Sequence, residues 1–413
     1  MNLLRYFVIK IIPNFLFWFP VITSIFWTIS AIHFYNTKEK KEYKIDEKSL
    51  PPVTIIIAAH NEEKFIKDTL EALKNLNYPK YDVIVVDDAS KDKTPKIVEE
   101  YLKFENFHFI KLNKNVGKAM AVNIGVLHSK TDLVVVIDAD TILDKDSLKY
   151  VAHHFKKIPR LAAVTGNPRV LNRTNILTYI QTAEFSSIIS LLKRSQRSIG
   201  RIFTVSGAFT TYNKNVLKEV GCFSHLTATE DIDITWRIEK NFYNVFYEPK
   251  AIAWIRVPES LKELIRQRKR WALGGWHMLR IHFDILFNFK YKRLFIAFIE
   301  FVLAYIWSIL FIVFSFLWIL SKLFLYKGFT ISPIPTWYGA FISLVCLVQF
   351  FVSSLLDKKY DKGIFKYYFF VVWYPIIYWT LNPILVFITL KEGLFGILEG
   401  KGIWHPPDRK IKF

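Results

Sequence analysis

Three short acidic clusters contain residues that could bind a metal ion or accept a proton. Asp138 and Asp140 are separated by one residue, Asp87-Asp88 lies upstream, and Thr229-Glu230-Asp231 lies downstream. Two closely spaced carboxylates suit Mg²⁺ or Mn²⁺, and such an ion could also bind a diphosphate. The Asp231 carboxylate could be the general base for an attacking hydroxyl. Turn formation at strand ends and stabilisation of a first helical turn are the structural alternatives for these clusters.

Basic and aromatic residues could complete such a site. Gly117 would let the backbone approach a ligand, and Lys118 could neutralise a phosphate, although the glycine spacing of a Walker loop is absent. Further along, Gln267, Arg270 and Trp271 lie in a stretch that mixes cations with leucine and tryptophan. Arg270 could hold a leaving diphosphate and Trp271 could stack on a sugar. Attachment to a membrane surface alone would also explain this stretch.

The elements that must position these residues are short β-branched runs alternating with helical patterns. Strands are predicted at 53–58, 81–86, 107–111 and 133–137, with helices after a cap at Asn61, at 94–102 and at 118–127. This alternation is typical of a doubly wound parallel sheet, in which ligands bind at the carboxyl ends of the strands. His60-Asn61-Glu62, Asp87-Asp88 and Asp138–Asp140 all follow predicted strands, so one shared site is predicted.

Long apolar segments flank this predicted domain. Residues 14–36 carry no charge, and three further candidates lie near 295–323, 335–356 and 367–390. Roughly 20 apolar residues cross a bilayer as a helix, so each segment is long enough. We therefore predict an anchor at 1–36, a water-soluble domain at 37–258, amphipathic interface helices at 259–293, about three membrane helices at 294–390 and a basic tail at 391–413.

The charge pattern orients this arrangement. The chain has a formal net charge of +20, but it carries no nucleic-acid-binding motif, and its 2 cysteines offer neither a disulfide framework nor a zinc spacing. The basic run at 37–43 predicts that the soluble domain is cytosolic. Three further spans would then place the basic tail outside, against the same rule. Pro375 and Pro383 could break the last segment and give a re-entrant path, and the sequence leaves this open.

Taken together and in order, the motifs resemble those of the processive family 2 glycosyltransferases, which include cellulose, hyaluronan and chitin synthases. The order is Asp88, Asp138-x-Asp140, Thr229-Glu-Asp231 and Gln267-x-x-Arg270-Trp271. One subgroup is closer still, the bacterial poly-β-1,6-N-acetylglucosamine synthases of biofilm matrices. The resemblance to this subgroup rests on the stretches VTGNPRVLNR (164–173), EFSSIISLLKRSQ (184–196), FTVSG (203–207), TEDIDITW (229–236), FYEPKAIAW (246–254), WYPIIYW (373–379) and a terminal W-x-x-P-D-R.

The resemblance implies an inverting, multi-pass enzyme of the plasma (inner) membrane with a GT-A-type, Rossmann-like cytosolic domain inserted between transmembrane helices. UDP-N-acetylglucosamine would be the donor, a growing polysaccharide the acceptor, and a small membrane accessory subunit a possible partner. Residue by residue, the family's roles fall on catalytic Asp231 and Glu230, on a gate of Gln267, Arg270 and Trp271, on donor contacts Asp88, Asp138, Lys118, Glu62 and Ala58, on metal ligands Asp140 and Asp138, and on sugar or acceptor contacts Asn167, Arg169, Ser206 and Gly207.

Four other functions compete with this interpretation. A non-processive enzyme that transfers one sugar to a polyprenyl phosphate would share the strand-end aspartates, and a synthase of the cellulose, chitin or hyaluronan type would make another linkage. A membrane transporter with a nucleotide-sensing domain would release no UDP. The run Val-Val-Val-Ile-Asp-Ala-Asp-Thr at 134–141 also fits the nucleophile motif of haloacid-dehalogenase-type phosphatases, but that motif usually opens its domain and here other strands precede it.

Overall fold

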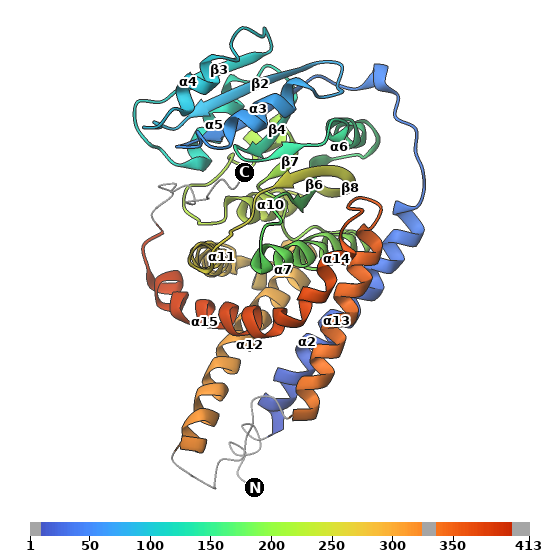
Figure 1. Ribbon diagram of the computed structural model, residues 1–413, viewed down its shortest axis with the longest axis vertical. Coiled ribbons are helices and arrows are strands. Elements are labelled where there is room, and N and C mark those ends of the chain that lie inside the picture. The colour runs from blue at the N-terminus through green and yellow to red at the C-terminus, as the bar shows by residue number, and fades with distance from the viewer. Residues whose placement is uncertain (1–9, 324–335, 399–413) are drawn as a thin grey trace.

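The computed structural model describes residues 10–323 and 336–398, and Figure 1 shows an α/β part above a set of long helices. The terminal W-x-x-P-D-R motif lies outside the described residues, as does most of the basic tail.

One eight-stranded mixed sheet forms the α/β part, with the order β3-β2-β1-β4-β7-β6-β8-β5. The four predicted strands are confirmed and pair in parallel, whereas β7 is antiparallel to both β4 and β6. The expectation of a purely parallel sheet is therefore wrong for the second half. The strands are β1 Val53–Ala59, β2 Tyr81–Asp87, β3 Phe107–Lys111, β4 Leu133–Asp138, β5 Ile142–Leu143, β6 Leu161–Val170, β7 Phe209–Asn213 and β8 Asn244–Ile255.

Helices cover both faces of the sheet because its central strands are apolar on both sides. Ile55 and Ile57 of β1 pack with α3 (Ile66–Lys74), α4 (Thr94–Glu99) and α6 (Ser147–Lys157). Ile56 and Ala58 pack with α5 (Lys118–His128), α9 (Lys214–Glu219) and α10 (Glu230–Lys240) on the other face. The predicted cap at Asn61 is wrong, because α3 begins at Ile66 and Asn61 has a positive φ of 55°.

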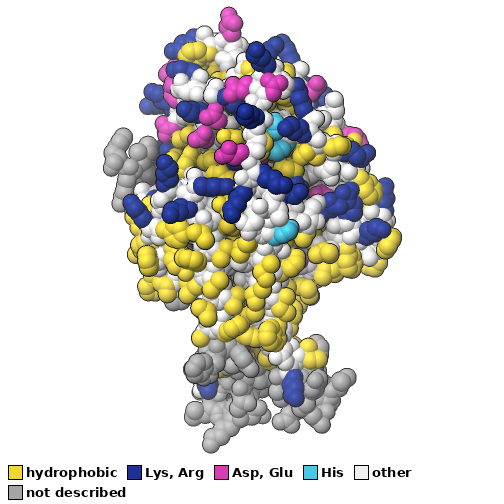
Figure 2. Space-filling view, turned by 90° about the vertical axis from the view of Figure 1, so that its right-hand side faces the viewer, with side chains coloured by type: hydrophobic (Ala, Val, Ile, Leu, Met, Phe, Trp, Pro, Cys, Tyr) yellow, Lys and Arg dark blue, Asp and Glu magenta, His cyan; other side chains and the backbone are white. Residues whose placement is uncertain are grey.

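Helices near the membrane side connect the sheet to the long apolar segments. They are α7 (Ile176–Glu184), the π-helix η4 (Phe185–Leu191), α8 (Leu192–Ser198) and the amphipathic α11 (Leu261–Ile281). Among the described residues, three helices are long and apolar enough to cross a membrane, at Ile12–Glu39, Phe289–Leu323 and Gly339–Asp357. They contain all of α2 (Ile12–Phe34), all of α12 (Lys292–Leu323) and most of α13 (Thr336–Asp357). Figure 2 shows a broad band of hydrophobic side chains below a zone rich in lysine and arginine.

The last apolar segment does not continue in the direction of those three helices. It is broken between Phe365–Trp373 and Ile377–Phe395 with a bend of 59°, and Pro375 lies in the first turn of α15 (Tyr374–Phe395). α15 then runs beside α11: the Trp276 indole donates a hydrogen bond to the Val386 carbonyl at 3.0 Å, and Arg280 donates to the Gly396 carbonyl at 2.6 Å. Figure 1 shows α15 lying across the direction of α2, α12 and α13.

A buried ion cluster joins the sheet to these helices. Arg194 of α8 lies 2.6 Å from Glu39 and 2.7 Å from Asp357, while Arg169 of β6 lies 2.5 Å from Asp357. All four side chains are almost completely buried. Removing one partner of such a cluster costs about 3–5 kcal/mol, because the remaining charge is left uncompensated. The cluster therefore fixes the orientation of the α/β part relative to the apolar helices.

Candidate active site

The carboxyl ends of the central strands form the floor of the site. Ala58 of β1 is in register with Asp138 at the end of β4, so the two chain turns that follow lie side by side. Asp88 follows β2, and its carboxylate accepts hydrogen bonds from the backbone N–H groups of Val116 and Gly117 at 2.7 and 2.9 Å. Asp88 thus holds the loop that leads into α5, where Gly117 adopts a positive φ of 87°.

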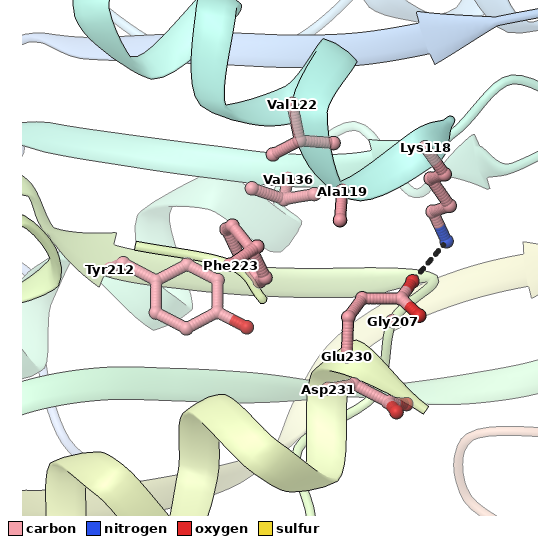
Figure 3. Close-up of a pocket in the computed structure, with 9 residues that line it drawn as sticks. All are labelled: Lys118, Ala119, Val122, Val136, Gly207, Tyr212, Phe223, Glu230 and Asp231. Atoms are coloured by element: carbon pink, nitrogen blue, oxygen red, sulfur yellow. Dashed lines mark ion pairs between the residues drawn. The ribbon is translucent and has the colours of Figure 1, made fainter. Parts of the chain in front are cut away.

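Lys118 is the centre of the site because it joins the sheet to α10. Its ammonium lies 2.5 Å from Asp138 and 3.3 Å from Glu230, and all three side chains are at least two-thirds buried. Figure 3 shows Lys118 reaching from the start of α5 toward Glu230 at the start of α10. A single cation therefore holds together two elements that are distant in the sequence, at the edge of the sheet where a phosphate could bind.

Asp231 lies beside this ion pair. One of its oxygens accepts a hydrogen bond from its neighbour Ile232 at 3.0 Å, and the other would be 3.4 Å from a β-carbon added to Gly207. A side chain at position 207 would therefore cover the carboxylate. Burial, followed by the negative charge of Glu230, raises the pKa of Asp231. A carboxylate with a raised pKa is a better proton acceptor.

The Gln267-x-x-Arg270-Trp271 motif reaches the same region from α11. Arg270 donates a hydrogen bond to the Ala228 carbonyl at 3.1 Å, directly before the acidic residues that begin α10. A side chain at Gly274 would collide with Thr229, so α11 approaches α10 closely. Gln267 is half-buried one turn before Arg270. The structure therefore brings together Arg270 and the start of α10, although 36 residues separate Asp231 from Gln267 in the sequence.

The remaining predicted contacts lie at varying distances from this centre. Gly207 lines the cavity with Lys118 and Asp231. Its neighbour Ser206 donates its backbone N–H to Thr165 at 2.8 Å. Glu62 is buried, and its backbone N–H donates to the Thr94 hydroxyl at 2.8 Å.

Two predicted acceptor contacts have other partners. Asn167 is fully buried within the sheet and donates to the Pro249 carbonyl at 3.0 Å. The Arg169 guanidinium is bound to Asp357 and to the Ser186 hydroxyl, so the structure does not bring it to the cluster around Lys118. Its role in this structure is to join the sheet to α13.

Sequence reasoning missed three residues near Asp231. Tyr212 of β7 and Phe223 line the cavity, and Figure 3 shows the Tyr212 hydroxyl on the side of Glu230 and Asp231. Lys193 of α8 is buried, with its ammonium 3.4 Å from the Thr165 hydroxyl, and burial lowers its pKa to about 7 despite the opposing charge of Asp231. The run of aromatic and β-branched residues Phe209-Thr-Thr-Tyr212 was the signal that could have revealed β7.

The carboxylates of the site could hold a divalent metal ion only together with oxygen atoms of a bound ligand. Within residues 10–323 and 336–398, no group of three or more histidine, cysteine, aspartate or glutamate side chains is arranged to hold a metal ion. Asp138 and Asp140 do provide two hard oxygen donors. Burial raises the pKa of Asp138, Lys118 opposes that effect, and the negative charge of Asp140 adds to it. Mg²⁺ and Mn²⁺ are commonly held by one or two carboxylates together with phosphate oxygens and water, so this donor set is suitable.

Comparisons with known proteins agree with this arrangement. The family model described as glycosyl transferase family 2 matches residues 54–221. The chain is 35% identical over 403 residues to a poly-β-1,6-N-acetyl-D-glucosamine synthase of Staphylococcus epidermidis, which covers 96% of this chain and 98% of that protein. It is 36% identical over 407 residues to the protein of the same name from Staphylococcus aureus (strain COL), again covering 96% and 98%.

A solved structure has the same fold. It is a mannosyltransferase from Pyrobaculum calidifontis in complex with GDP-mannose and Mn²⁺, with a TM-score of 0.55, 17% identity, and coverage of 91% of this chain and 98% of that one. The GT-A-type, Rossmann-like fold predicted for the α/β part is thereby confirmed.

Proposed function

The chain belongs to the poly-β-1,6-N-acetyl-D-glucosamine synthases of glycosyltransferase family 2, and from this premise we propose that it polymerises N-acetylglucosamine from UDP-N-acetylglucosamine with inversion. One structural observation carries the proposal: Lys118, Asp138, Glu230 and Asp231 meet at the carboxyl ends of the parallel strands. Nucleotide ligands bind at that edge in open α/β sheets.

Donor binding is assigned to the floor of the site. Asp138 and Asp140 would hold Mg²⁺ or Mn²⁺, which when bound supplies charge stabilisation to the departing diphosphate. Lys118 and Arg270 add positive charge on the protein side of the same group, where preorganised cations are most effective in a water-poor site. Ala58, Glu62 and Asp88 shape the strand-end loops against which the uridine would lie.

Asp231 is assigned the role of general base. An inverting transfer is a single displacement in which an acceptor hydroxyl attacks the anomeric carbon from the face opposite UDP. One base is sufficient, and no covalent nucleophile is needed. The raised pKa of Asp231 and the open position at Gly207 support this assignment. Trp271 would stack on the acceptor sugar, with Gln267 beside it.

The three spanning candidates and the course of α15 support a membrane arrangement. We infer that the α/β part is cytosolic in a multi-pass protein of the plasma membrane, that α2, α12 and α13 cross, and that the bent segment returns along α11 without crossing. The lysines after α13 and the basic tail would then be cytosolic, as the positive-inside rule expects. The growing polysaccharide would leave between these helices, with a small membrane accessory subunit as a further partner.

Incubation of the purified protein with labelled UDP-sugars tests the proposal. UDP-N-acetylglucosamine with Mg²⁺ or Mn²⁺ should give a long polymer with β-1,6 linkages. A product carrying one sugar on a polyprenyl phosphate would instead support the non-processive alternative. Absence of sugar-dependent UDP release would contradict every glycosyltransferase assignment.

A further inference from the structure

Trp271 is supported by a neighbour on its own helix. The central carbon of the Arg268 guanidinium lies 4.3 Å from the centre of the Trp271 ring. Positions 268 and 271 are three residues apart, so their side chains project from one side of α11. Arg268 is 7% exposed, whereas Arg270, the basic residue of the family motif, is exposed. The tryptophan therefore rests on a buried cation that the family resemblance did not single out.

The same guanidinium also contacts the bent membrane segment. It lies 5.1 Å from the Tyr378 ring centre, and Tyr378 stacks on Tyr374 with ring centres 4.7 Å apart and planes 13° apart. Tyr374 in turn lies 4.8 Å from Phe350 of α13. A continuous column of planar groups therefore runs from Trp271 through Arg268 to the start of α15 and on to α13.

Among the residues that the structure describes, one carboxylate forms an ion pair with Arg268. Its terminal nitrogen donates to Glu184 at the end of α7 at 2.7 Å, and Glu184 is 2% exposed. The Nε of Arg268 has no hydrogen-bond partner among the described residues. Salt-bridge formation thus uses only part of the guanidinium, and its central carbon also lies over two aromatic rings. Lysine would keep the charge but would lose the planar contacts.

We propose that Arg268 is a positioning residue that sets the orientation of Trp271 according to the position of the bent segment at Tyr374 and Tyr378. This inference rests on the proposed function, in which Trp271 faces the acceptor sugar. If α15 moves as the polymer advances, the Arg268 guanidinium, which contacts both Tyr378 and Trp271, would change the position of the Trp271 ring. The donor floor around Lys118 lies on other elements and is not part of this column.

Arg268→Lys tests the proposal in the full-length protein in lipid nanodiscs. The ion pair with Glu184 can persist, but the stacking on Trp271 and Tyr378 is lost. We expect the rate of polymer synthesis to fall roughly tenfold or more, as for other misplaced substrate-positioning groups. The KM for UDP-N-acetylglucosamine and the rate of acceptor-independent hydrolysis of this donor should stay within about twofold of wild type. The thermal unfolding midpoint should stay within a few degrees of wild type.

Matched variants separate stacking from general disturbance. Arg266→Lys makes the same change at an exposed position of α11 and should leave all readouts unchanged. Tyr378→Phe keeps the ring and should polymerise at close to the wild-type rate, whereas Tyr378→Leu should reproduce the Arg268→Lys defect. If Arg268→Lys does not fold, the two Tyr378 variants still decide the question.

Two results would overturn the inference while leaving the proposed function intact. One is a wild-type rate and chain length for both Arg268→Lys and Tyr378→Leu. The other is a parallel loss of polymer synthesis, donor hydrolysis and thermal stability, which is the signature of a merely structural ion pair. A wild-type protein that makes no polymer from any UDP-sugar would instead refute the proposed function, and the inference with it.

Discussion

Replacing Asp231 with asparagine separates proton abstraction from donor binding. The change keeps the shape of the side chain, and an amide oxygen can still accept the hydrogen bond from Ile232. The negative charge is lost, and with it the capacity to take a proton from the acceptor hydroxyl. Lys118 retains its contacts with Asp138 and Glu230.

The magnitude of this defect follows from the role assigned to Asp231. A positioned general base contributes about 10²–10⁴-fold to a rate, which corresponds to roughly 3–5 kcal/mol of activation free energy. Folding should not suffer. Burial and the charge of Glu230 raise the pKa of Asp231, so its ionised form is unfavourable in the folded protein. A neutral asparagine removes that unfavourable charge, and the thermal midpoint should equal or exceed that of wild type.

The assay measures UDP release and UDP binding on the same preparations. Asp231→Asn should lose transfer by about 10²-fold or more while its affinity for UDP stays within about threefold of wild type. Asp132→Asn, which removes an exposed carboxylate just before β4, is the matched control and should be fully active. Transfer by Asp231→Asn within tenfold of wild type, or a loss of UDP affinity as large as the loss of rate, would refute the base assignment.

Four further outcomes are expected. Lys118→Gln removes the cation between two carboxylates, so the KM for UDP-N-acetylglucosamine should rise about tenfold or more in steady-state titrations. Chelation should abolish transfer reversibly, and Asp140→Asn should need a higher Mn²⁺ concentration for half-maximal rate than wild type. Glu239 has a pKa raised from 4.5 to about 7 by burial, against which Arg201 acts. Its contribution to stability is therefore complete below pH 4.5 and lost as the pH rises toward 7. Glu239→Gln should flatten that part of the thermal midpoint's pH dependence and raise the midpoint at pH 8. A cysteine introduced at Lys391, in a protein without the two native cysteines, should react with a membrane-impermeant thiol reagent only from the cytosolic side. Labelling from the outside would contradict the return of α15 along α11.

Local pattern predicted the first half of the sheet and its strand-end aspartates well. The β-branched runs that become β1, β2 and β4 are buried on both faces, and such strands carry their signal in a few consecutive residues. The antiparallel strand β7 escaped prediction because its run Phe209-Thr-Thr-Tyr212 is short and, although made of strand-forming residue types, contains no apolar β-branched residue. Because β7 was not predicted, Tyr212, which lines the cavity beside Asp231, was not predicted as a site residue.

Contacts between distant segments could not be predicted from local pattern. Arg169 was assigned to the acceptor by resemblance, but its partner Asp357 is 188 residues away and no local feature links the two. The contact of Arg268 with Tyr378 depends in the same way on the path of α15. The charge pattern alone did not decide on which side of the membrane the tail begins. In the proposed arrangement, that side depends on the bend near Pro375.

Linkage and size analysis of the product made from UDP-N-acetylglucosamine by the purified full-length protein tests the central claim most directly. The account predicts a divalent-metal-dependent β-1,6-linked polymer that grows with time and is absent from the Asp231→Asn protein. A different linkage, a product limited to a single sugar, or equal synthesis by Asp231→Asn would contradict it.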